Sequence, residues 1–203
     1  GASVRHRLAR VFVERLDDAP RAIKVYETLV EDRPGDEVAA DELRRLYTQA
    51  GRQRDLAELL RKLIDRAETK EKRTALRLDL ARLEETLGER DHAADTYRDV
   101  LSEEPDHSSA AIALSELLEK DGRDEELAEL MSSQIARSKE RGDTATELLL
   151  EVRLGQMYES RLKDPERALE TFESVLSREP KHEGALTAVG RIAEDRSEMN
   201  RAE

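Results

Sequence analysis

The stretch Val100–His107, with the letters VLSEEPDH, occurs three times in this chain in related forms. Its counterparts are Leu29–Asp36 (LVEDRPGD) and Val175–His182 (VLSREPKH), and the three prolines stand 71 and then 75 residues apart. A second kind of segment alternates with the first, because Gly51–Leu59 (GRQRDLAEL) returns as Gly122–Leu130 (GRDEELAEL), again offset by 71. Self-similarity at a regular spacing predicts a repeat architecture, here with a period of about 72 residues built from two unlike halves of about 36.

Each half of the period has the pattern of a helical hairpin. In Ala93–Leu101 the larger apolar residues recur every three to four positions, which indicates one buried face of a helix. The proline of each strong half ends the second helix, because proline lacks an N–H and clashes with the preceding turn. Asp36 and Asp106 follow at positions suited to capping the next helix. Glycines at the turns inside the hairpins favour left-handed backbone, and these are Gly51, Gly88 and Gly122.

The pattern predicts an all-α chain of about eleven helices arranged as antiparallel hairpins. We expect helices at 4–16, 19–32, 36–50, 53–68, 71–87, 90–103, 107–120, 123–139, 143–161, 165–178 and 182–198. The corresponding units are 4–35, 36–70, 71–106, 107–141, 142–181 and a terminal helix at 182–203, all within one array over 1–203. Because 65–73 and 136–144 lack a stopping proline, longer helices are expected there. Residues 1–3 (GAS) carry no start methionine and are interpreted as a cloning remnant on an excised fragment.

Composition and charge exclude several classes of function. The chain has 40% charged residues, 3% aromatic residues and no cysteine, so disulfides, thiol catalysis and cysteine-based metal sites are excluded. Its net charge of −12 disfavours nucleic acid and anionic membrane as partners, because both attract positive proteins. No apolar run approaches the roughly 20 residues needed to span a bilayer. The compartment stays open, with the cytoplasm favoured over the periplasm.

These residues resemble the tetratricopeptide repeat, whose pattern is W-x₂-L-G-x₂-Y, then A-x₃-F, then P over about 34 residues. The fifth unit is the most similar, with Leu154-Gly155 and Tyr158 followed by Ala168, Phe172 and Pro180, although Glu151 stands at the tryptophan position. Other units match less completely, so strong and degenerate repeats alternate in a style that is similar to bacterial members. The resemblance implies a right-handed superhelical solenoid in which small residues let helices approach and aromatic residues, including Tyr47, fill the core.

The sequence shows no constellation of catalytic residues. The four histidines form no H-x₃-H or H-E-x₂-H pair, His107 and His182 read as surface residues at helix starts, and His6 reads as isolated. The adjacent carboxylates, Glu84-Glu85 among them, are interpreted as solvated faces, and no glycine-rich phosphate loop is present. We therefore predict no enzyme, no cofactor and no metal site.

The resemblance implies that a partner binds along the first helix of each hairpin. The position after the small residue points into the groove, and it reads Arg10, Arg45, Arg82, Glu116, Gln156 and Arg191. One turn earlier lie apolar Leu78, Ile112 and Val152. Arginine suits bidentate capture of carboxylates, which favours an acidic or C-terminal peptide. The alternative is that these arginines pair with acidic residues on their own helices.

Three functions remain open at this stage. The chain is predicted to be a scaffold that binds a protein or peptide in the groove. It could instead be a structural segment of a longer solenoid that self-associates end to end. A regulatory arm of a larger multidomain protein is the third alternative, and these residues do not discriminate it from the other two.

Overall fold

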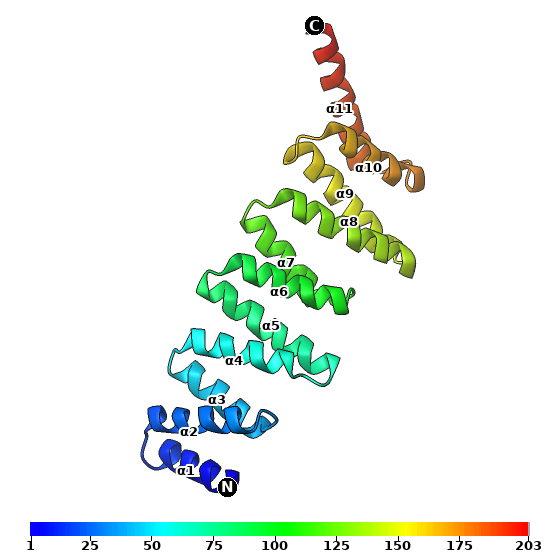
Figure 1. Cartoon of the computed structure of the whole chain (residues 1–203). Helices are drawn as coiled ribbons and strands as arrows, with labels where there is room; N and C mark the ends of the chain where they lie inside the picture. The colour runs from blue at the N-terminus through cyan, green and yellow to red at the C-terminus, as the bar shows by residue number, and fades with distance from the viewer. Residues whose placement is uncertain (203) are drawn as a thin grey trace. The chain divides into compact units, whose positions relative to one another are not determined.

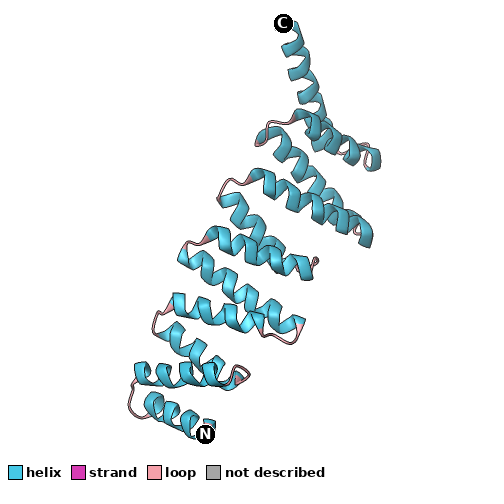
Figure 2. Cartoon of the chain, viewed as in Figure 1, coloured by secondary structure: helices cyan, strands magenta, loops and turns pink. Residues whose placement is uncertain are grey.

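The computed structural model describes residues 1–202, and the side chains of residues 1–196. Over that range the chain forms eleven α-helices and no strand (Figures 1 and 2). The helices belong to two compact units, Gly1–Glu103 and Glu104–Glu203. The predicted all-α class, built from antiparallel helical hairpins, is confirmed. None of the helices in the described part is both long enough and apolar enough to cross a bilayer.

The first unit contains six helices that pack in chain order. They are α1 (Ala2–Glu14), α2 (Ala19–Asp32), α3 (Glu37–Gln49), α4 (Gln53–Asp65), α5 (Lys70–Leu87) and α6 (Arg90–Glu103). One core cluster of this unit joins α1, α2, α3 and α4 and includes the fully buried Ala9 and Ala22, with Tyr26 and Tyr47 beside them. Tyr47 is therefore a core residue, as its position predicted.

The second unit contains five helices, again packed in chain order. They are α7 (Ser108–Lys120), α8 (Asp124–Arg141), α9 (Thr144–Ser160), α10 (Pro165–Arg178) and α11 (Glu183–Ala202). The closest approach lies between α9 and α10, where a Cβ built on Gly155 would come within 2.8 Å of the Phe172 ring. Phe172 is completely buried. A small residue at this position thus lets the two helices of the hairpin approach, as the repeat pattern implied.

The turns explain where the helices end. Gly51, Gly88 and Gly122 have φ of +65°, +76° and +65°, a conformation that glycine adopts without strain. In the first and fifth units the same turn is one residue longer, and the left-handed positions are Asp17 and Lys163. Short polar or flexible side chains tolerate this conformation better than β-branched ones.

Most helix boundaries agree with the prediction, and one expectation is wrong. The helices α2, α6 and α10 begin and end at the predicted residues, and α8 continues to Arg141 where a longer helix was expected. In contrast, α4 ends at Asp65 although no proline stops it. The reason is that Ala67 is buried and the Thr69 side chain accepts from the Lys72 N–H, so the chain leaves α4 to start α5. Residues 2 and 3 lie within α1.

The capping prediction is right for one aspartate and wrong for the other. Asp36 accepts from the Ala39 N–H at 3.0 Å and caps α3. Asp106 does not cap α7, because the following residue, His107, accepts from the Ala110 N–H through Nδ1 at 3.2 Å. The carboxylate of Asp106 instead forms an ion pair with Arg141. His182 repeats this arrangement at the start of α11, where Nδ1 accepts from the Ala185 N–H at 3.1 Å.

Candidate functional site

A cleft of about 500 Å³ lies between α3 and α5 in the first unit. Its polar wall contains three arginines, Arg44, Arg45 and Arg82, and its apolar side contains Leu60 and Leu83. The remaining lining residues are Asp41, Thr48, Leu56, Asp79 and Thr86. The structure thus brings together two of the predicted groove arginines, Arg45 and Arg82, on neighbouring first helices.

Arg44 is a member of this cleft that the sequence prediction missed. Counting by repeat register, it stands where Ala9, Ala81 and Gly155 stand in the stronger repeats. An arginine at a position reserved for small residues is a departure from the pattern, and that departure is the signal that could have identified it. Its side chain is 30% exposed and donates to Asp79 at 2.6 Å, which joins α3 to α5.

The cleft arginines already have carboxylate neighbours. Arg45 pairs with Glu42 at 2.7 Å, and Arg82 lies 4.0 Å from Asp79. These are pairs within one helix, as the alternative interpretation proposed. Because the side chains are well exposed, each such pair stabilises the fold by only about 0–1 kcal/mol. The guanidinium groups are therefore paired but remain available for exchange with another carboxylate.

Arg10 lies outside the cleft, but both Arg10 and Arg45 lie near Tyr26. Arg10 stands 3.9 Å from Glu14 on α1 and is strongly exposed. Both arginines are close enough to Tyr26 to affect it: burial and then Glu42 raise the pKa of this phenol, while Arg10 and Arg45 oppose the rise. The first-helix positions of the first two repeats thus form one mixed-charge surface around the Tyr26 hydroxyl.

The other predicted groove residues are distributed over several helices. On α5, Leu78 is half-buried, and on α7 both Ile112 and Glu116 are exposed. On α9, Val152 is half-buried and Gln156 is exposed. Arg191 on α11 donates twice to Glu159 of α9, at 2.7 Å each. Their role in binding stays a prediction.

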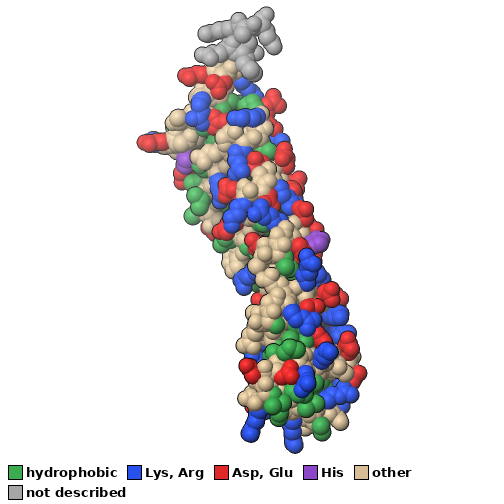
Figure 3. All heavy atoms as spheres, turned by 90° about the vertical axis from the view of Figure 1, so that its left-hand side faces the viewer, with side chains coloured by type: hydrophobic (Ala, Val, Ile, Leu, Met, Phe, Trp, Pro, Cys, Tyr) green, Lys and Arg blue, Asp and Glu red, His purple; other side chains and the backbone are tan. Residues whose placement is uncertain are grey.

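One exposed apolar residue on this face was not predicted. Leu149 is 70% exposed on α9, one turn before Val152. Ile112 on α7 is 59% exposed. The second unit therefore presents separate aliphatic side chains where the first unit presents arginines. On the face that Figure 3 shows, acidic and basic side chains are interspersed.

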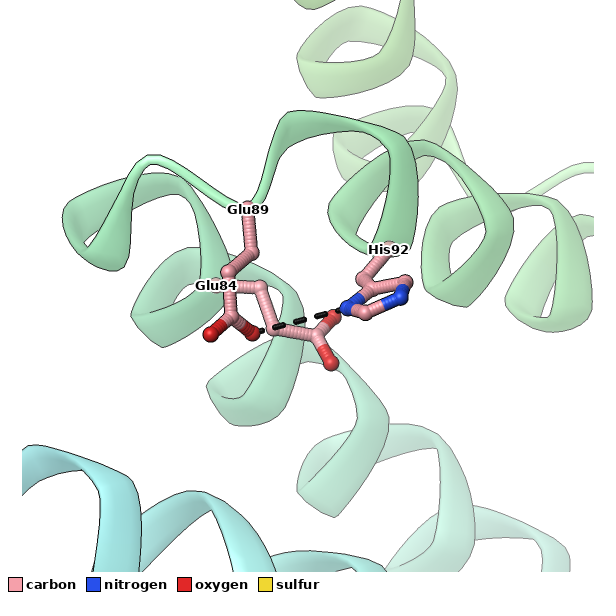
Figure 4. A group of neighbouring side chains, drawn as sticks. All are labelled: Glu84, Glu89 and His92. Carbon is pink, nitrogen blue, oxygen red and sulfur yellow. Dashed lines mark hydrogen bonds and ion pairs between the residues drawn. The ribbon is translucent and has the colours of Figure 1, made fainter.

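Three residues of the first unit could in principle hold a metal ion. The ligand atoms of Glu84, Glu89 and His92 lie within 4.8 Å of one another (Figure 4). However, Arg61 donates to one oxygen of Glu84 at 2.8 Å and lies 3.8 Å from Glu89. Thr96 donates to the other Glu84 oxygen at 2.8 Å. Because the Arg61 guanidinium already pairs with both carboxylates, we interpret this group as a structural ion-pair network.

This network corrects one interpretation made from the sequence. Glu84 does not belong to a solvated face, because its side chain is only 2% exposed. A buried carboxylate needs a partner, and Arg61 supplies it from α4, a distant position in the sequence. The same holds in the second unit, where the buried Glu147 and Glu151 both pair with Arg178. Glu151, which stands at the tryptophan position of the fifth repeat, is thus buried as one member of an ion pair.

His6 is also not isolated, contrary to the sequence interpretation. Its Nε2 lies 2.8 Å from the Asp36 carboxylate at the start of α3, and its ring contacts Tyr26 edge-on. Burial tends to raise the pKa of Asp36, but the hydrogen bonds from His6 and from the Ala39 N–H outweigh it and lower the value. This contact fixes α1 to α3 across one repeat.

The fold and its surfaces define a class of protein: an array of helical hairpins with polar, irregularly charged first-helix faces. Two stretches of the chain, 78–133 and 151–182, match family models described as tetratricopeptide repeat. These two stretches therefore contain tetratricopeptide repeats, as the sequence pattern predicted. A comparison with curated proteins gives no match.

Several solved structures are similar to this chain. The MamA protein is 17% identical, covers 89% of this chain and 92% of its own, and has a TM-score of 0.48. A tetratricopeptide repeat protein from Parabacteroides merdae ATCC 43184 is 14% identical, with coverages of 99% and 75% and a TM-score of 0.48. YrrB, described as a TPR protein with an unusual peptide-binding site, is 15% identical, with coverages of 90% and 88% and a TM-score of 0.45. At these identities and TM-scores, structural likeness says nothing about what this chain binds.

Proposed function

We propose that this chain is a protein-interaction scaffold, and that the cleft between α3 and α5 binds an acidic segment of a partner protein. The observation that carries the proposal is the grouping of Arg44, Arg45 and Arg82 around one cleft with a leucine-lined side. Its volume of about 500 Å³ lies within the range of pockets that hold small ligands or a few side chains.

Recognition in this cleft combines two kinds of contact. An aliphatic or aromatic side chain of the partner would cover the half-buried Leu56 and Leu83, and carboxylates beside it would meet the guanidinium groups. Arginine offers two parallel N–H donors to a carboxylate, and this geometry adds specificity to charge. The incoming carboxylate replaces Glu42 or Asp79 as the partner of an arginine, so the net gain is modest and falls with salt. We therefore expect a weak, acid-selective interaction.

The test uses a defined probe because the natural partner is unknown. Random 12-residue peptides displayed on phage are selected on the intact chain, and the selected peptides are analysed for enrichment of Asp and Glu. The strongest peptide is then labelled and titrated by fluorescence polarisation with the wild type and with the Arg45→Glu/Arg82→Glu double variant. Reversing two charges at the cleft is expected to weaken binding at least about 100-fold.

A matched control carries the same charge change elsewhere. Lys24→Glu/Arg54→Glu alters two exposed side chains on the second helices α2 and α4, away from the cleft. It should bind the peptide within about threefold of the wild type once the long-range charge effect is considered. Selection of peptides without acidic enrichment, or equal loss in both double variants, would contradict the proposed site.

A further inference from the structure

A second cleft, of about 430 Å³, lies between the first halves of α3 and α5, next to the α3–α5 cleft. The two clefts share Asp41 and Arg44 as lining residues. The second cleft has apolar surface as well, from the half-buried Leu63 of α4 and the exposed Pro34 in the turn before α3. The two clefts are therefore neighbouring parts of one channel between α3 and α5.

Two ion pairs across this channel place its parts in order. Lys72 of α5 pairs with Glu37 of α3, and seven residues further along both helices Arg44 pairs with Asp79. Both pairs join residues that are 35 apart in the sequence, so α3 and α5 run in the same direction. The second cleft lies between the two ion pairs, because Glu37, Lys72 and Arg44 all line it. The α3–α5 cleft begins at Arg44 and continues toward the ends of both helices.

Arg44 separates the two clefts. Its guanidinium is held from two sides, by Asp79 at 2.6 Å and by Asp41 at 3.5 Å. A guanidinium has five N–H donors, so these contacts leave donors for a further acceptor. Because two carboxylates already balance its charge, a neutral acceptor such as a peptide carbonyl suits Arg44 better than a third carboxylate. The stronger repeats have alanine or glycine at this position, and neither side chain could divide a channel.

The two clefts differ in charge. Three arginines and two aspartates line the α3–α5 cleft, which leaves one positive charge in excess. The second cleft is lined by equal numbers of basic and acidic side chains, which are Arg44, Arg66, Lys72, Glu37, Asp41 and Glu68. Charge therefore favours a carboxylate in the α3–α5 cleft, whereas the second cleft favours an uncharged side chain that covers Leu63 and Pro34.

The dimensions of the channel set the spacing of two anchors. Seven residues of α-helix span about 10 Å, which is the length of the second cleft between its ion pairs. The α3–α5 cleft extends beyond Arg44 and Asp79 to Thr48 and Thr86, which is about 6 Å along α3 and about 10 Å along α5. The centres of the two clefts are thus about 8–10 Å apart. In a polyproline II segment, side chains three residues apart point the same way and are about 9 Å apart.

We propose that the partner segment is extended and binds this channel through two anchors that are three residues apart. An acidic residue meets Arg45 and Arg82 in the α3–α5 cleft, and an aliphatic or aromatic residue occupies the second cleft. The backbone between the anchors crosses Arg44, which donates to a peptide carbonyl. This inference rests on the proposed function, because it specifies the sequence pattern of the acidic segment and assigns a second site to it.

Phage selection on the intact chain tests the spacing of the anchors. Peptides selected on the wild type should carry an apolar residue three positions from an acidic one more often than at any other spacing. Arg44→Ala should keep the acidic enrichment and lose the preferred spacing, because the residue that divides the channel is gone. Asp79 and Asp41 are 44% and 74% exposed, so the loss of Arg44 leaves no buried charge, and circular dichroism should show an unchanged fold.

Gly35 allows the second cleft to be filled by itself. It lines this cleft, and a Cβ built on it would meet no atom within 4 Å, so Gly35→Trp adds bulk without displacing the backbone. Fluorescence polarisation then compares the strongest selected peptide with a copy whose apolar anchor is alanine. Gly35→Trp should weaken the parent peptide about 10-fold and the alanine copy less than about twofold. The Arg45→Glu/Arg82→Glu variant should weaken both peptides by the same factor.

A matched control and the possible outcomes separate this inference from the proposed function. Gly190→Trp makes the same change at a glycine of the second unit that also meets open space, and it should leave both affinities unchanged. Acidic enrichment without a preferred spacing, or an equal loss for both peptides in Gly35→Trp, overturns the two-anchor arrangement and leaves the acidic cleft standing. A preferred spacing that persists in Arg44→Ala overturns the role of Arg44. Selection without acidic enrichment overturns both proposals.

Discussion

Gly155 lies on α9 directly against the ring of Phe172, and adding one methyl group there tests the packing of the second unit. The new Cβ of Gly155→Ala would stand 2.8 Å from Cε1 and 2.9 Å from Cζ of that ring. Carbon atoms in contact normally lie about 3.5–4.0 Å apart, so the ring must move by roughly 1 Å. Phe172 is completely buried and has little room to do so.

The expected change is the difference between two effects. Overpacking a close-packed core costs about 1–3 kcal/mol. Replacing glycine by alanine inside a helix offsets about 1 kcal/mol of that cost. The net effect is a loss of up to about 2 kcal/mol of stability. Gly190→Ala is the matched control: it occupies the same repeat position on α11 but meets open space, so it should be neutral or stabilising by up to about 1 kcal/mol.

Urea denaturation followed by circular dichroism measures both variants, with the midpoint as the reported quantity because repeat arrays can unfold in more than one step. Phe172→Leu in the Gly155→Ala background supplies a double-mutant cycle. If the clash is real, the two substitutions should couple by about 0.5–3 kcal/mol, with the leucine costing less in the alanine background. A Gly155→Ala variant as stable as the wild type, or additive effects in the cycle, would refute this account of the packing.

Three further perturbations address the ion pairs and caps. Arg61→Met should destabilise the first unit by about 1–3 kcal/mol, measured by urea denaturation, because it leaves the buried Glu84 without its cation. Glu103→Gln should lower the melting temperature at pH 7, because hydrogen bonds from Arg77 and Arg73 hold the pKa of Glu103 below its ordinary value. The stability from this lowered pKa is present above the unfolded-state pKa and is lost as the pH falls through the folded-state pKa. The difference in melting temperature from the wild type should therefore vanish in acid, and a difference that persists at pH 2 would contradict this account. His107→Ala should cost about 0.5–2 kcal/mol by removing the cap of α7, and His107→Asp should restore most of it; no loss in the alanine variant would mean that the cap is unimportant.

Sequence reasoning located correctly those helix ends that depend on residues nearby in the chain. The boundaries of α2, α6 and α10 follow from nearby proline, aspartate and glycine residues, so a reader of the sequence can locate them to the residue. The prediction for α4 was wrong because its end is set by the start of α5. A helix end that is determined by a neighbouring helix cannot be predicted from the local sequence pattern.

The candidate site was predicted only in part for the same reason. Arg45 and Arg82 could be named from their repeat positions, whereas Arg44 required the knowledge that its small-residue position faces Asp79 of the next repeat. Whether an arginine is paired or available depends on side chains that approach from another helix. The sequence pattern contains no information about those distances.

Two carboxylates of α5 show more clearly that burial cannot be predicted from the sequence alone. Glu84 and Glu85 are neighbours in the sequence and both looked solvated, yet Glu84 is buried against Arg61 while Glu85 is half-buried and accepts from Tyr97. The choice between the two environments depends on which side of α5 faces α4 and α6.

The repeat period, the helical class and the positions of most turns were determined by the sequence alone, because periodicity and turn chemistry are properties of residues close together in the chain. The burial of the first helices was not determined in this way. Only the tertiary structure showed that residues at the repeat positions of Val4, Leu8 and Val11 pack into the core in later repeats, whereas these three side chains are exposed on α1. Burial depends on what packs against a face, and that is decided by the helix that lies next to it.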